Sequence, residues 1–400
     1  MFPLTEPRGP LSAAVIDHYL GRRGALTAGQ FLIDESRLLA AGPGGVIDDD
    51  DFQLALTCCY EAHYQGVDVE VDLEWDPQLL AFRRLLEMAF ERALRQLVPM
   101  HAGTPDARAV LMGLATGGAG GAAAPSLSRW MLEHGSVEAF REFLVHRSAY
   151  QLKEADPHSW AIPRLTGRAK AALVEIQHGE YGAGAAVQVH ARLFAEALDA
   201  AGLSSTYGAY VGRLPGITLA TQNLISMFGL QRRFAPAIVG HLALFEMTSV
   251  GPMGRYAAAA DALGLPAAVR RFYDVHVEAD VGHSKLALDE LVDGHVTDHP
   301  NDAALVVWGA ETLTAVEGRF SRHLISHWDR GESSLLAEPA GPAAPTAGFA
   351  AAQPPRARRA GSMAARSRGS ESRSTPTWAS ASANATPCSP TSRAAWAATS

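Results

Sequence analysis

Two histidines and an aspartate share one short stretch of this chain and could act together. His276, Asp280 and His283 are separated by four and three residues. Since an α-helix turns by about 100° per residue, this spacing places the three side chains along one stripe of a helix, within about two turns. Imidazole and carboxylate together suit iron, manganese or zinc. The stretch therefore indicates part of a transition-metal site, although a polar helix face with aligned histidines would show the same pattern.

Further ligands would have to come from other helices, because helical bundles bind metals between side chains of facing helices. Glu246 lies in an otherwise apolar segment, Leu244–Ser249. An ionised carboxylate is costly there unless it binds a metal or another cation. Glu154 stands near the end of a predicted helix, Val137–Ala155. Both glutamates are therefore candidate ligands.

The spacing leaves two alternatives for the remaining ligands. Glu175 and His178 form a Glu-x-x-His pair, which would mimic a ferritin-like di-iron bundle together with the Asp-x-x-His of the first stretch. The other alternative takes Glu180 and His190, ten residues apart on one helix that the intervening glycines would loosen. Spacing alone does not decide between them.

The segments that must position these residues are predicted to be helices, because apolar residues recur at three- and four-residue steps. Those in the N-terminal third are Leu11–Leu20, Asp51–Gln65 and Pro77–Leu97. The later ones are Val137–Ala155, Gly167–Gln177, Ala185–Ala201, Ile217–Phe228, Ala235–Ser249, Ala267–Asp293 and Asp302–Trp328, and the pattern over Ala267–Asp293 also allows two helices with a break between them. Glycine or proline separates them, as at Gly251-Pro252. Alternating clusters of Val and Ile are scarce, so the sequence predicts an all-α fold without a sheet.

Composition divides the chain into three parts. Residues 1–125 form an N-terminal helical region, residues 126–332 the main helical domain, and residues 333–400 a low-complexity tail. The glycine-rich run 116–125 lacks the Lys-Ser/Thr ending of a phosphate loop and is predicted to be a flexible connection. The tail is rich in Ala, Pro, Ser and Arg and has no lysine. It cannot bury enough apolar surface to offset its ordering entropy, so we expect it to be disordered.

Bulk composition excludes several classes of function. A net charge of −8 argues against a general nucleic-acid or anionic-membrane binder. The chain has no signal-peptide pattern at its start and no run of about 18 apolar residues, so no membrane span is expected. Its three cysteines, two of them adjacent, provide neither a disulfide framework nor a thiolate metal site. We therefore expect a cytoplasmic protein.

Dispersed motifs resemble those of the haem-oxygenase-like di-iron oxidases and oxygenases, which include bacterial iron-containing redox enzymes. The motifs, in order, are Tyr150-x-Leu-Lys-Glu-Ala-Asp-Pro-His158, Glu175-Ile-x-x-x-Glu-Tyr-Gly182, His190-x-x-Leu-Phe194, Glu246-x-Thr-Ser249 and Phe272-Tyr-x-x-His-Val-Glu-Ala-Asp-x-x-His283. The resemblance spans roughly Val137–Trp328. It implies a haem-oxygenase-like helical bundle with an N-terminal helical extension.

The resemblance also implies a site for two iron ions, which are Fe²⁺ in the reduced resting state. Each iron would have three ligands, and some members of the family recruit one further carboxylate. The first iron would be held by Glu180, His190 and His283. The second iron would be held by Glu246, His276 and Asp280, and the further carboxylate would be Glu154.

The function implied is that of a non-haem di-iron oxidase or oxygenase, an iron-dependent oxidoreductase that uses O₂. Its small-molecule substrate would be an amino acid, an amine or a fatty acid, and an external electron donor is compatible with this chemistry. By analogy with the family, residues 1–125 would serve dimerisation in a homodimer or cap the domain. The alternatives are a metal-free or haem-dependent enzyme and a non-catalytic binding module on the same helical fold.

Overall fold

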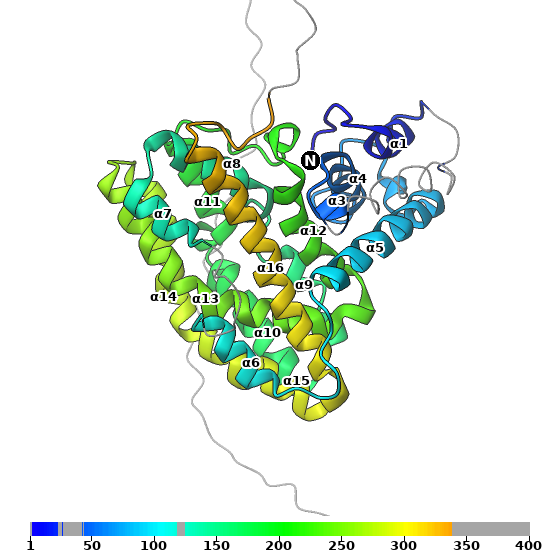
Figure 1. Cartoon of the computed structure of the whole chain (residues 1–400), viewed down its shortest axis with the longest axis vertical. Helices are drawn as coiled ribbons and strands as arrows, with labels where there is room; N and C mark the ends of the chain where they lie inside the picture. The colour runs from blue at the N-terminus through cyan, green and yellow to red at the C-terminus, as the bar shows by residue number, and fades with distance from the viewer. Residues whose placement is uncertain (1, 23–25, 27–41, 43, 118–124, 338–400) are drawn as a thin grey trace, which may run out of the picture. The chain divides into compact units, whose positions relative to one another are not determined.

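The computed structural model of the chain is built from helices (Figure 1). It describes residues 2–22, 26, 42, 44–117 and 125–337, which all belong to one compact unit, Met1–Ala343. Within these residues no strand occurs, and a single isolated bridge joins Phe2 to Val67. The predicted all-α fold class is confirmed.

The first third of the chain is helical, as predicted. Its elements are α1 Pro10–Tyr19, α3 Gly44–Ile47, α4 Asp50–Glu61, η1 Val71–Trp75, α5 Pro77–Leu97 and α6 Ala107–Ala115. Asp49 caps α4 by accepting from the Phe52 amide, and Asp76 caps α5, which begins at Pro77. Helix α4 packs on α1 and on α12, and in this way joins the first third of the chain to the rest.

The remaining helices form the bundle that positions the candidate site. Its longer helices are α7 Leu127–His134, α8 Val137–Gln151, α10 Gly167–Glu180, α11 His190–Ala200, α12 Gly216–Leu230, α13 Ala235–Ala262, α14 Ala267–Leu286 and α16 Ala303–Trp328. The short ones are α9 Asp156–Ser159, η2 Ile162–Arg164, η3 Gly182–Gly184, η4 Ala186–Gln188, η5 Val211–Arg213, η6 Arg232–Phe234, η7 Ala287–Val292, α15 Asp293–Asp298 and η8 Pro300–Asp302. Helix α13 is the central one, with α14 and α16 along its sides.

Several predicted helix ends were wrong. Helix α13 does not end at Ser249 but runs through Pro252 to Ala262. A proline inside a helix costs about 3 kcal/mol, and the long interfaces of α13 with α14 and α16 offset that cost. Within the helix predicted over Ala267–Asp293, the break that the sequence allowed is the π-helical turn η7. The short helices α3, α6 and α7 were not predicted, because their apolar patterns are too brief to show a period.

Within the described part of the chain, α13 is the one helix that is long and apolar enough to cross a membrane. Together with the preceding turn it covers Arg232–Ala262, with a mean hydropathy of 1.3 in its most apolar window. Since 67% of that window is buried inside the protein, it has the character of a core helix.

The described chain continues a few residues past the last helix. Ser334 is buried, and its hydroxyl donates to Glu142 and lies 2.9 Å from His146 Nε2. The amide of Leu336 donates to the carbonyl of Arg213. Residues 338–400, most of the segment predicted to be disordered, lie outside the described residues, as do residues 118–124 of the predicted flexible connection.

Two glycines allow α13 and α16 to touch through their backbones. A Cβ atom on Gly240 would lie 1.8 Å from the carbonyl oxygen of Val306, and one on Gly309 would lie 2.0 Å from that of Ala237. No side chain fits at either position unless the two helices separate. The central pair of helices therefore depends on these glycines.

We predict that Gly240→Ala lowers the free energy of unfolding by roughly 1–3 kcal/mol, because the added methyl group forces the helices apart. Denaturant titration measures the change. The matched control is Gly113→Ala in α6, where a Cβ meets nothing within 4 Å. That change should stabilise the helix by about 0.5–1 kcal/mol. Equal stability of the Gly240→Ala variant and the unmodified protein would contradict the close contact.

His146 on α8 is buried as a neutral imidazole. Its Nδ1 lies 2.8 Å from the hydroxyl of Thr218, and its Nε2 bonds to Ser334. Burial, reinforced by the nearby His323 and Arg147, holds the pKa of His146 well below its usual value. The unfolded chain therefore binds a proton at this residue that the folded chain does not bind.

We predict that acidification from about pH 7.5 to about pH 5.5 destabilises the protein. A histidine whose pKa is lowered by folding takes up its proton in the unfolded state first, so stability falls as the pH drops below the unfolded value of about 6.5. His146→Gln should make the melting temperature less sensitive to pH over this range. His178→Gln, at an exposed position, is the control and should leave the sensitivity unchanged. An identical pH dependence in all three proteins would refute this role of His146.

Candidate metal centre

The seven candidate ligands come from five elements that meet in the interior of the bundle. Glu154 follows the end of α8, Glu180 is the last residue of α10 and His190 is the first of α11. The remaining four are one residue of α13, Glu246, and three of α14, His276, Asp280 and His283. Six of the seven are buried, and the side chain of His283 is 13% exposed.

These side chains form two groups that share Glu180. The first group contains Glu154, Glu180, His190 and His276, and the second contains Glu180, Glu246, Asp280 and His283. Within each group the potential ligand atoms all lie within 4.8 Å of one another. Each group thus has the size and the donor set of a metal site that includes two or more carboxylates.

In the first group the imidazoles approach the glutamates closely. His190 Nδ1 lies 2.7 Å from Glu180 Oε2, and His276 Nε2 lies 3.4 Å from Glu154 Oε2. The rings of His190 and His276 are 4.3 Å apart between centroids. All four members of this group face one point.

In the second group His283 lies at the centre. Its Nδ1 is 3.5 Å from Glu180 Oε1, 3.5 Å from Glu246 Oε2 and 3.7 Å from Asp280 Oδ1. Since Glu180 presents one oxygen to His190 and the other to His283, its carboxylate lies between the two groups.

This grouping differs in one respect from the one that the resemblance implies. His276 lies with Glu180 and His190, whereas His283 lies with Glu246 and Asp280. The two histidines have thus exchanged places. They lie on one stripe of α14 but about two turns apart along its axis, so each meets a different set of ligands.

The two alternatives that the spacing left open are separated by burial. Glu175 and His178 on α10 are exposed and belong to neither group, whereas Glu180 and His190 are buried in the first group. Glu180 and His190 were expected to share one helix, but they lie in two. Helix α10 ends at Glu180, and in the loop that follows Ala183 has a φ of 49°. This left-handed backbone turns the chain so that His190 begins a new helix.

A similar break in the helix, at the end of α8, positions Glu154. Helix α8 ends at Gln151 instead of Ala155, and Ala155 has a φ of 75°. Such a conformation costs a residue with a Cβ about 1–2 kcal/mol. The side-chain Nε2 of Gln177 donates to the carbonyl of Ala155 at 2.7 Å and holds the turn. Strained backbone of this kind clusters at functional sites.

The residue before Glu154 ties the site to the N-terminal helices. Lys153 is buried and forms an ion pair with Glu61 of α4. Its Nζ lies 4.2 Å above the ring of Tyr64, and Tyr207 donates to the second oxygen of Glu61 at 2.5 Å. The N-terminal region therefore fixes the turn that carries a candidate ligand.

Two contacts orient the histidines of α14. His276 Nδ1 donates to the carbonyl of Phe272 at 2.7 Å, which leaves its Nε2 free to accept and aimed at the first group. A Cβ on Gly179 would lie 2.6 Å from His283 Nε2. Only a glycine at this position leaves room for that ring. Sequence analysis missed Gly179, although a glycine directly before Glu180 in a helix was a visible signal.

Unpaired polar atoms show that the cluster is not satisfied by the protein alone. Glu154 Oε2, His190 Nδ1, His276 Nε2 and His283 Nδ1 are buried without a hydrogen-bond partner. His190 Nδ1 lies near Glu180 but does not hydrogen-bond to it. Buried polar atoms are normally paired. These four are the atoms that would face metal ions, so the residues fit such a group.

The electrostatics of the cluster favour positive charge at its centre. Burial, together with the carboxylates of Glu180 and Asp280, raises the pKa of Glu246 to about 8. Burial opposes protonation of His276, but Glu154, Glu180 and Asp280 outweigh it and raise the pKa of that imidazole to about 10. Two divalent cations would balance the charge of the four carboxylates and displace the protons from the imidazoles.

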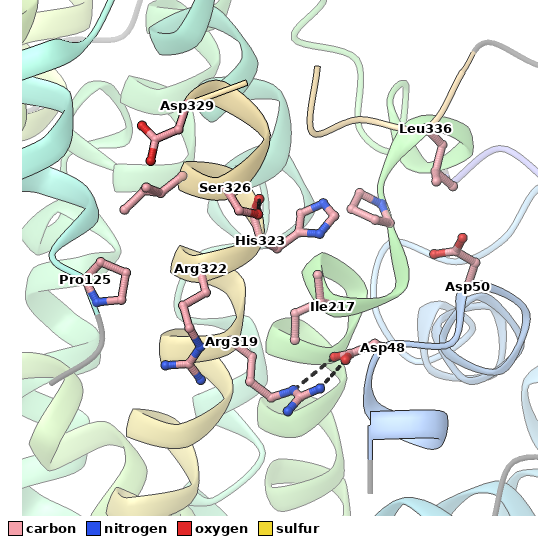
Figure 2. Close-up of a pocket in the computed structure, with 12 residues that line it drawn as sticks. Asp48, Asp50, Pro125, Ile217, Arg319, Arg322, His323, Ser326, Asp329 and Leu336 are labelled. Carbon is pink, nitrogen blue, oxygen red and sulfur yellow. Dashed lines mark hydrogen bonds and ion pairs between the residues drawn. The ribbon is translucent and has the colours of Figure 1, made fainter. Parts of the chain in front are cut away.

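Two cavities differ in their relation to the cluster. A cavity of about 10 Å³ lies among Glu154, Glu180, Glu246, His276 and Asp280. A cavity of about 660 Å³ lies elsewhere, between α16 and the segment before α4, and contains none of the candidate ligands. Figure 2 shows Arg319 reaching from α16 to Asp48 across it. The larger cavity is therefore separate from the metal chemistry.

Comparison with known protein families agrees with this geometry. The family model described as iron-containing redox enzyme matches residues 141–318. The match includes all seven candidate ligands, and the all-α bundle is consistent with the expected haem-oxygenase-like fold. No curated protein matches the chain significantly.

We predict that Gly179→Ala weakens Fe²⁺ binding at the candidate centre about tenfold or more, because the methyl group displaces His283. Anaerobic calorimetric titration measures the affinity, and circular dichroism checks that the fold is retained. Gly282→Ala, next to His283 on α14 with nothing within 4 Å of the new Cβ, is the matched control and should bind as before. Equal affinities of the two variants would show that the position of His283 does not matter.

Proposed function

We propose that this protein is a non-haem di-iron oxidoreductase that uses O₂ to oxidise a small organic substrate. The observation that carries the proposal is the pair of ligand groups joined by Glu180. A shared carboxylate between two sets of imidazole and carboxylate donors suits two metal ions held side by side. The match of residues 141–318 to a family model of iron-containing redox enzymes supports iron as the metal.

Iron would be held by Glu154, Glu180, His190 and His276 in the first group and by Glu180, Glu246, Asp280 and His283 in the second. Iron supplies the one-electron and O₂ chemistry that amino-acid side chains lack. The protein contributes position, charge and exclusion of water.

The chain's own residues perform these tasks in distinct ways. His276 Nδ1 donates a hydrogen bond to the carbonyl of Phe272, so that Nε2 is the atom directed at the site. Phe245 and Leu242 line the small cavity on the α13 side and limit the entry of water. Burial raises the pKa of Glu180, but the charges of His190, His276 and His283 outweigh it and lower that pKa, so this carboxylate stays ionised.

The proposal extends to partners and location. The protein would use O₂ and a small-molecule substrate, draw electrons from an external donor where the reaction needs them, and act in the cytoplasm as a homodimer. The contact of Glu61 with Lys153 supports a capping role for the N-terminal helices, since it links α4 to the ligand turn.

A haem-dependent function is less well supported by the site. A haem needs one or two axial ligands and a wide slot, whereas here five of the seven candidate ligands line a cavity of only about 10 Å³. Four buried carboxylates would have no purpose in a haem pocket. The geometry therefore favours the di-iron proposal.

We predict that anaerobic loading yields about two Fe²⁺ per chain, in line with the two ligand groups. Glu180→Ala should lose both ions, because both groups depend on it. His276→Ala and Glu246→Ala should each retain about one ion, since each belongs to a single group. Metal analysis after gel filtration measures the stoichiometry, and exposure to O₂ should produce a transient visible absorption only in proteins with both ions.

The control is His178→Ala, an exposed position on the same helix as Glu180. It should bind iron like the unmodified protein. A chain that takes up no iron, or one whose iron content is the same in Glu180→Ala, would rule out the proposed centre.

A further inference from the structure

A second cavity lies directly beside the metal cluster. Its volume is about 320 Å³, within the range of small-molecule binding sites. Helices α7, α8, α13, α14 and α16 contribute to its walls. Tyr150, Phe245, Ser249 and Met253 line both this cavity and the small cavity of the cluster. We call it the side chamber, and only this shared wall separates it from the candidate ligands.

Apolar and aromatic side chains make up most of the chamber wall. Phe143, Tyr256 and Tyr273 form one aromatic side, and the rings of Phe143 and Tyr256 stack with centroids 4.6 Å apart. Leu244 and Leu313 lie in the wall as well. Such a surface favours a ligand with a flat, apolar body.

The charged residues of the chamber cancel each other. Arg147 donates to both oxygens of Glu317, at 3.0 and 2.9 Å. Its guanidinium also lies 5.5 Å from the ring of Phe143 and 4.6 Å from that of Phe320, so the pair is held from several sides. A bidentate pair of this kind offers no surplus charge to a ligand. An anion or a cation in the chamber would lose its hydration without gaining a counter-charge.

Two polar atoms of the chamber wall lack partners. The hydroxyl of Tyr273 and the Oε1 of Gln151 are buried and form no hydrogen bond. Both residues are more than nine-tenths buried and both line the chamber. Since unpaired buried polar groups are costly, they point to a ligand that pairs them. That ligand accepts from Tyr273 and donates to Gln151.

We propose that the side chamber binds the organic substrate and that this substrate is an uncharged molecule with an aromatic or similarly apolar body and a hydrogen-bonding group. The assignment of the ligand as substrate rests on the proposed di-iron function. The selectivity for an uncharged ligand rests on the chamber alone, so it is testable without iron.

Three probes of matched size test the charge selectivity in the full-length protein without added iron. They are 2-phenylethanol, phenylacetate and 2-phenylethylamine, which carry no charge, a negative charge and a positive charge. Ligand-observed NMR titration should give a dissociation constant for 2-phenylethanol about tenfold or more below those of the charged probes. Equal or tighter binding of either charged probe, or no binding of 2-phenylethanol, would overturn the proposal.

Two variants locate the binding. Leu313→Trp should fill the chamber and abolish binding of 2-phenylethanol, whereas Val174→Trp, at an exposed position of α10, should not. Tyr273→Phe should weaken binding about two- to tenfold through the lost hydroxyl. Tyr210→Phe, whose hydroxyl accepts from the Ser204 amide outside the chamber, should leave binding unchanged.

Unchanged binding in Leu313→Trp would place the ligand elsewhere and overturn the assignment. Circular dichroism confirms that each variant is folded. Because the iron stoichiometry is measured separately, an empty chamber in a protein that binds two irons refutes this inference alone. Failure to bind iron refutes the proposed function and leaves the measured selectivity of the chamber standing.

Discussion

The burial of four carboxylates and three imidazoles in one place is the constraint on which the rest of this structure depends. Removing ionised groups from water is costly unless an opposite charge compensates them. Elsewhere in the protein the compensation is internal, as in the ion pairs Lys153–Glu61 and Arg147–Glu317. The cluster around Glu180 contains no lysine or arginine, and several of its ligand atoms have no hydrogen bond. Without metal the imidazoles, whose pKa the carboxylates raise, compensate part of this charge, and bound cations would take over that role.

The backbone is interrupted where the ligands are needed. A continuous helix would present Glu154 and His190 at fixed steps along its axis, and neither would meet α14. Instead α8 stops before Glu154, and α10 and α11 are separated by a loop, with Ala155 and Ala183 in left-handed conformations. The π-helical turn η7 follows the last ligand of α14, and such turns occur frequently at functional sites. Helix ends bring the ligands together because they can point side chains in directions that a regular helix cannot.

The sequence predicted the parts of the site that lie on one regular helix. The stripe of His276, Asp280 and His283 follows from the helical period, and Glu246 follows from its apolar surroundings. Glu180 and His190 required the family resemblance, since spacing also allowed Glu175 and His178. The groups in the structure pair the two histidines of α14 with other ligands than the resemblance implies, and periodicity could not decide this, because it fixes the direction of a side chain around its own helix and not the identity of the helix opposite. The helix breaks and the space that Gly179 provides arise from tertiary packing, so short-range patterns did not reveal them.

The candidate metal cluster is rich in negative charge, the side chamber is neutral, and the two share a wall. The cluster concentrates negative charge and therefore selects cations, while the chamber pairs Arg147 with Glu317 and therefore selects neither sign. If the chamber carried an unpaired carboxylate, it would compete with the cluster for metal ions, and an unpaired arginine would weaken the charge that holds them. A bidentate pair avoids both effects and still keeps the wall polar at one point. Charge neutrality in the chamber is therefore a condition for a strongly acidic metal centre a few side chains away.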